Sequence, residues 1–149
     1  TYEITSDTTA KVKGPEATTL LTQVTIPEKA TNSLNGESYT VTAIADKAFR
    51  NTRFNGEITS ITLPDSLKEI GDFAFFSCLK LEDINLPDGL TKIGYQAFQN
   101  CYSLTEITIP SSVTTMSSHV FNRCIGLKKV TFEKNSQLSA LPDAEISPH

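Results

Sequence analysis

The chain has 149 residues, of which 38% are hydrophobic, and it carries a formal net charge of −4. This length fits one domain. The acidic balance and the absence of any run of Lys or Arg argue against a nucleic-acid-binding protein. No apolar stretch approaches the roughly 20 residues of a membrane-spanning helix, and no secretory signal begins at Thr1. The apolar fraction is low for a globular core of this size, but it suffices for a chain of units that each bury only a thin interior stripe.

Residues 1–43 show no fixed period, and we predict that they form an N-terminal β cap. The segments 2–5 and 10–13 flank a turn-like Ser-Asp pair, which predicts a hairpin. Residues 23–26 have the pattern of a strand. Residues 39–44 predict another strand, which leads into the rest of the chain.

A repeated pattern begins after this cap. Residues 70–92 and 93–115 match position by position, and a degenerate copy follows from Met116. An earlier copy, residues 44–69, is three residues longer. A fixed period of roughly 20–50 residues is typical of a solenoid, in which each coil packs on its neighbours. We therefore predict about four repeats of 23–26 residues over 44–141, followed by a C-terminal tail at 142–149.

Each copy has the same internal order. In residues 104–109 apolar and polar side chains alternate, which predicts a strand, and the proline that follows ends it. Residues 113–116 predict a second short extended stretch. In residues 96–101 the inward-facing positions are spaced by three and four, which predicts about one helical turn. The fold class is therefore an α/β repeat with a parallel sheet. The equivalent aromatic residues should form an interior ladder: Phe49, Phe75, Phe98 and Phe121.

The three cysteines, Cys78, Cys101 and Cys124, occupy the same position in successive copies. Equivalent side chains in stacked coils point the same way, which does not suit disulfide geometry. The spacing also lacks the paired Cys or His of a metal site. We predict reduced, buried thiols that pack as small hydrophobic groups, and we expect no metal and no cofactor.

The pattern AFQNCYSLTEITIP, within residues 93–115, resembles the bacterial leucine-rich repeat of the BspA type. The resemblance covers about residues 44–141, and YEIT…TAKVKG…VTIP near the N-terminus looks like the entry module of such proteins. It implies a curved, right-handed leucine-rich-repeat solenoid. It also implies a bacterial cell-surface or secreted location. Some members are adhesins for host matrix proteins such as fibronectin and fibrinogen, so the analogy suggests a binding module for a host or neighbouring-cell protein or glycan.

Two surfaces are candidates for such binding. The first is the polar outer face of the main sheet, where the alternative is that Thr simply suits an exposed strand. Its predicted ligand-binding residues are Ser60, Thr62, Asp83, Asn85, Glu106, Thr108, Lys129 and Thr131. The second is the turn segment of one coil, where Phe73 and Phe76 would share an exposed face. There the alternative is that Phe54 folds over them.

No catalytic motif is present: the acids are scattered, and neither a Gly-rich phosphate loop nor a GxSxG or HExxH pattern occurs. We therefore do not expect an enzyme. The alternative to a binding module is a structural spacer, or a fragment of a longer repeat array with no ligand of its own.

Overall fold

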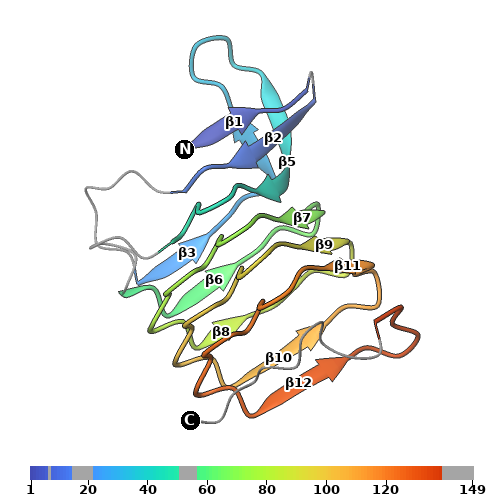
Figure 1. Cartoon of the computed structure of the whole chain (residues 1–149). Helices are drawn as coiled ribbons and strands as arrows, with labels where there is room; N and C mark the ends of the chain where they lie inside the picture. Colours follow the sequence, from blue (N-terminus) through green and yellow to red (C-terminus); the bar gives the residue numbers. More distant parts are fainter. Residues whose placement is uncertain (7, 15–21, 51–56, 139–149) are drawn as a thin grey trace.

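The computed structural model describes residues 1–6, 8–14, 22–50 and 57–138, and these form a stack of coils (Figure 1). The repeats contribute short strands to two sides of the stack, and the strands on each side come from successive coils. The strands are β1 (Tyr2–Ile4), β2 (Thr9–Val12), β3 (Gln23–Thr25), β4 (Lys29–Thr31), β5 (Ser38–Ile44), β6 (Ser60–Thr62), β7 (Glu69–Ile70), β8 (Asp83–Ile84), β9 (Lys92–Ile93), β10 (Glu106–Ile109), β11 (Thr115–Met116) and β12 (Lys129–Phe132).

One sheet runs continuously along the stack. In it β5, β7, β9 and β11 are parallel neighbours, and Ile44, Ile70, Ile93 and Met116 lie in register. At its N-terminal end β2 joins β5, and β1 pairs with β2 in antiparallel register. The hairpin predicted from the first residues is therefore confirmed. The second extended stretch predicted in each coil is also confirmed, since it forms β7, β9 and β11.

The strands on the other side of the coils form two separate sheets. β3, β6 and β8 make one parallel sheet, and β10 pairs in parallel with β12. Residues 23–25 thus form the predicted strand, and they pair with β6 as the strand of a repeat does. Among the described residues no pairing joins β8 to β10, so the main sheet that we expected to be continuous is divided between coils two and three.

The interior is organised around the phenylalanine ladder. Phe49 and Phe75 stack with ring centroids 5.5 Å apart, Phe75 and Phe98 at 5.1 Å, and Phe98 and Phe121 at 5.6 Å. The ring planes of these pairs are nearly parallel, with interplanar angles of 15°, 19° and 18°. All four side chains are buried, so the predicted ladder is confirmed. Stacked aromatic pairs contribute about 0.5–1.5 kcal/mol beyond the burial of their area.

The helical turn predicted in each coil is not formed. In each coil the residues around the buried Phe of the ladder form turns. No α-helix occurs in the part of the chain that the structure describes. Alternate residues of the segment donate to the next coil instead: Phe73 N–H to Tyr95 O at 2.8 Å, and Phe75 N–H to Ala97 O at 2.8 Å. Backbone amides that an α-helix would bond four residues back are thus used between coils.

This arrangement needs positive φ at residues that are not glycine. The same repeat position holds Lys47 at φ 60°, Phe73 at 56°, Gln96 at 52° and His119 at 59°. A left-handed conformation costs about 1–2 kcal/mol for an ordinary side chain. The hydrogen bonds to the neighbouring coil offset this cost, because the N–H of the strained residue itself donates to that coil at Lys47, Phe73 and Gln96.

The cysteines are free and buried, which confirms the predicted reduced thiols. Each thiol donates to the carbonyl of the buried Phe in the preceding coil, from Cys78 to Phe49 at 3.1 Å and from Cys124 to Phe98 at 3.0 Å. Cys101 makes the equivalent bond to Phe75. The thiol of one coil therefore provides a hydrogen bond to a backbone carbonyl of the neighbouring coil, in addition to packing as a small hydrophobic group.

Stability should fall with pH above about 9 because of Cys78. Burial raises the pKa of this thiol from an ordinary 9.0 to about 12. Between these values the unfolded chain loses a proton that the native state keeps, so the free energy of unfolding decreases by about 1.4 kcal/mol per pH unit. Below pH 9 the contribution is fully present. Urea unfolding between about pH 8 and pH 10.5 measures how the free energy of unfolding depends on pH. Cys78→Ala should reduce this slope by the contribution of one proton. An unchanged slope in this variant would contradict the assignment.

Adjacent coils are also joined by aspartates that accept backbone N–H groups. Asp46 Oδ1 accepts from Asp72 N–H at 2.9 Å, and Asp72 Oδ1 accepts from Tyr95 N–H at 2.8 Å. Gly71 and Gly94 lie directly against these joints. An added Cβ would lie 2.4 Å from Asp46 Oδ1 at Gly71, and 2.6 Å from Asp72 N at Gly94. Glycine is needed here for close approach.

The division at residue 43 between cap and repeats stays a prediction. β5 crosses that boundary, because it runs from Ser38 to Ile44 and pairs with β2 and β4 as well as with β7. The N-terminal strands thus continue the same sheet as the repeats.

Candidate binding surfaces

The first candidate surface is the outer face of the divided sheet. Ser60 and Asp83 are in register on β6 and β8, and Glu106 and Lys129 are in register on β10 and β12. Thr108 and Thr131 are likewise paired. Of the predicted residues, Ser60 is half-buried and the others, Thr62 and Asn85 among them, are exposed. The structure places seven of the eight residues on two sheets rather than one, and Asn85 directly follows β8.

Charge is unevenly distributed over this face. Exposed acids lie on coils two and three, at Glu82, Asp83 and Glu106, and exposed lysines lie on the last coil, at Lys128 and Lys129. The two ion pairs of the described residues, Lys13–Glu3 and Lys80–Glu57, include none of these groups. Unpaired surface charges of this kind remain available to a partner.

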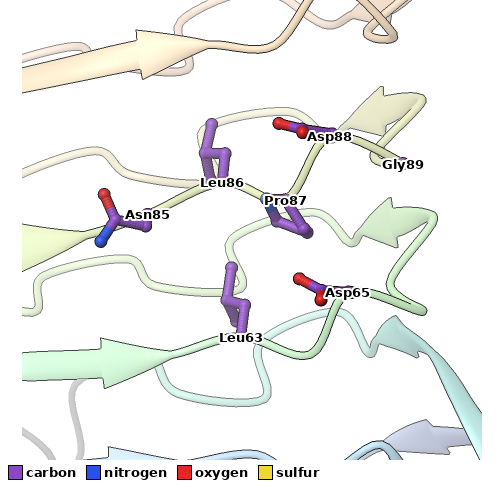
Figure 2. A pocket seen from close by; sticks show the side chains of 7 residues that line it. All are labelled: Leu63, Asp65, Asn85, Leu86, Pro87, Asp88 and Gly89. Atoms are coloured by element: carbon purple, nitrogen blue, oxygen red, sulfur yellow. The ribbon is translucent and has the colours of Figure 1, made fainter.

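A pocket opens where β6 and β8 end (Figure 2). Its volume is about 480 Å³, within the range of small-ligand sites. It combines an apolar wall with two carboxylates and an amide, and only Asn85 among its residues was predicted. The lining residues are Leu63, Asp65, Asn85, Leu86, Pro87, Asp88 and Gly89. Asp65 and Asp88 occupy equivalent positions in successive copies, so the repeat itself brings the two acids together.

The second candidate surface is a strip of rings along the turn segments. Phe73 packs edge-on against Phe76 at 5.7 Å and against Tyr95 at 5.4 Å between centroids, and Tyr95 packs against His119 at 5.8 Å. Arg50 lies 5.2 Å from the Phe76 centroid. Phe73 and Phe76 are each half-buried rather than exposed. Phe54, the residue that we considered as a cover, lies outside the described residues.

A third surface was missed. Leu79, Tyr102 and Ile125 occupy equivalent positions, each directly after a cysteine, and are 36%, 36% and 62% exposed. Leu79 O accepts a hydrogen bond from Ser103 N–H at 3.2 Å, so these coils are adjacent here. The signal was present in the sequence, because all three copies place a large apolar residue at an outward position.

Neither a metal centre nor a membrane-spanning helix is found in the described ranges. No group of three or more His, Cys, Asp or Glu side chains there is arranged to hold a metal ion. No helix within the same residues has the length and apolar character to cross a bilayer.

The stacked coils, parallel strands and buried ladder define a leucine-rich-repeat solenoid. Residues 17–140 match the family model of the BspA type leucine rich repeat region in six copies. The chain therefore belongs to the BspA-type leucine-rich repeat family, whose proteins are generally non-enzymatic binding modules and often surface proteins. The match begins inside the segment that we predict as a cap.

Solved structures show the same fold. A leucine-rich repeat protein from Bacteroides capillosus is 38% identical with a TM-score of 0.75, covering 89% of this chain and 93% of that one. One from Bacteroides ovatus is 30% identical with a TM-score of 0.65, covering 89% of this chain and 40% of that one. A leucine rich cell surface protein from Faecalibacterium prausnitzii is 27% identical with a TM-score of 0.65, covering 90% and 41%. A search of curated proteins found no match.

Proposed function

We propose that this protein is a binding module of the bacterial surface or of a secreted protein, and that it recognises a protein or glycan through the outer face of β6, β8, β10 and β12. The observation that carries the proposal is an exposed polar face whose charged side chains form no ion pair among the described residues. A rigid array of short strands presents such side chains at fixed spacing, which reduces the ordering cost of binding. The Faecalibacterium relative, which is described as a cell surface protein, supports the location.

The test is a binding screen of the full chain against immobilised fibronectin, fibrinogen and an array of glycans. For any ligand found, Glu106→Ala and Lys129→Ala should each lower the affinity about five- to tenfold, since both charges lie on the proposed face. Glu69→Ala is the matched control, because Glu69 is exposed on β7 of the other sheet. A screen without ligands, or a ligand whose affinity responds to none of the sheet-face changes, would rule out this surface.

A second role is favoured by the lengths of two relatives. This chain spans 40% and 41% of the Bacteroides ovatus and Faecalibacterium proteins, so the same coils occur there within longer chains. A spacer role predicts no ligand in the screen. It also predicts that joining this chain to further coils extends one cooperative stack.

A further inference from the structure

The pocket at the ends of β6 and β8 carries an amphipathic lining. Figure 2 shows the side chains of Leu63 and Leu86 between Asn85 on one side and the carboxylates of Asp65 and Asp88 on the other. Pro87 adds to the apolar part. A ligand that fills this pocket must therefore offer an apolar body and a polar, hydrogen-bonding tip.

The polar groups in the pocket are mostly acceptors. Asp65 and Asp88 are exposed, and neither takes part in an ion pair within the described part of the chain. Glu28 adds a nearby carboxylate, since its Oε1 accepts the Asp65 N–H at 2.7 Å. One cation lies at the rim: Lys68 Nζ would be 2.7 Å from a Cβ placed on Gly89. Three carboxylates against one ammonium leave the pocket negative.

Apart from Lys68 at the rim, and Lys129 in register with Glu106, the charged groups on the strands next to the pocket are acids. Glu82 and Asp83 are exposed at the start of β8, and Glu106 is exposed on β10. A partner that approaches this part of the sheet meets a negative field before it reaches the pocket. Such a field speeds the association of a positively charged partner and weakens with added salt.

We propose that this pocket receives an arginine side chain of a protein partner, with the guanidinium held by Asp65 and Asp88. The inference rests on the binding function proposed above and names the partner's chemistry. The aliphatic stem of Arg packs on Leu63 and Leu86, and its planar head supplies five donors to a site whose polar groups are mostly acceptors. Arg suits paired carboxylates better than Lys, because its fork makes two parallel hydrogen bonds to one carboxylate.

The experiment titrates the isotope-labelled full chain with N-acetyl-arginine methylamide and follows backbone amide shifts. We expect saturable shifts centred on residues 65, 85, 86, 88 and 89, since Pro87 has no backbone N–H. The citrulline analogue has the same shape without the charge and should bind at least about fivefold more weakly. Raising the salt concentration from about 50 mM to about 500 mM should lower the affinity for the arginine probe and leave the affinity for the citrulline probe unchanged.

Variants locate the probe. Asp65→Asn and Asp88→Asn keep the side-chain volume at exposed positions, and each should reduce the affinity for the arginine probe about threefold or more. Glu69→Gln removes one negative charge from the opposite sheet and should leave the affinity unchanged, which controls for net charge.

Several outcomes would overturn the inference: no saturable shift with the arginine probe, equal binding of the citrulline probe, or shifts at the same amides produced by a saccharide and not by arginine. These failures are separable from failure of the proposed function. A ligand from the screen that responds to Glu106→Ala and Lys129→Ala, but not to Asp65→Asn or Asp88→Asn, would keep the sheet-face function and reject the pocket.

Discussion

Replacing Phe98 by Ala is expected to lower the free energy of unfolding by about 3–5 kcal/mol. Phe98 is fully buried, and its ring stacks on Phe75 on one side and on Phe121 on the other. The truncation removes both stacked contacts and leaves a cavity in the middle of the interior ladder. Because each coil is stable only on its neighbours, the loss should appear in one cooperative transition of the whole stack.

Urea unfolding followed by circular dichroism and by Tyr fluorescence measures this effect, and the two signals should coincide. Phe76→Ala is the matched control, because Phe76 is half-buried at the surface and contacts Phe73 and Arg50. Its cost should be clearly smaller. Equal stability of the Phe98 variant and the wild type would falsify the central place given to the ladder.

Gly94→Ala is expected to destabilise the protein by about 2–3 kcal/mol or more. The added Cβ would lie 2.6 Å from Asp72 N, from Asp72 Oδ1 and from Gly71 C. Two of these atoms belong to the backbone of the preceding coil, so relief requires the coils to separate. Separation would stretch the bond from Tyr95 N–H to Asp72 Oδ1, which is 2.8 Å long. The loss therefore comes from strain rather than from a missing contact.

The neighbouring coil offers the control for this change. Ser117 occupies the equivalent position, already carries a Cβ, and follows a coil with Tyr95 in place of the aspartate. Ser117→Ala should change the free energy of unfolding by less than about 0.5 kcal/mol. Thermal or urea unfolding of both variants compares the two positions directly. Similar costs at positions 94 and 117 would show that the aspartate joint is not what makes glycine necessary.

The interior was predictable because it depends on side-chain type at a fixed period. The buried positions of Phe75, Cys78 and Ile84 recur in the next copy as Phe98, Cys101 and Ile107, and stacking follows from the period alone. The conformation of the turn segment was not predictable in this way. Lys47, Phe73 and Gln96 are not residues that favour positive φ, and the neighbouring coil imposes that conformation through its carbonyl groups.

The candidate surfaces were predicted less completely than the interior. Register placed Glu106 beside Lys129 and Thr108 beside Thr131, as the repeat implied. The separation of β8 from β10 was not predicted, because the strand patterns of the two copies are alike. The pocket was not predicted either. Its Asp65 and Asp88 recur at the repeat offset, but a hollow between them depends on backbone paths that composition does not reveal.

The aspartate joints also restrict how such an array can change during evolution. A coil that carries glycine at the position of Gly71 or Gly94 fits behind a coil that presents aspartate, as Asp46 and Asp72 do. Ser117, in turn, follows a coil that presents Tyr95. Duplication of the unit that carries both Gly71 and Asp72 would keep a matched joint, whereas placing the unit of Ser117 directly behind that of Asp72 would bring a Cβ against the aspartate. The units share one backbone pattern, but they cannot be placed in any order. The order of the units along the chain is therefore under selection together with their individual sequences.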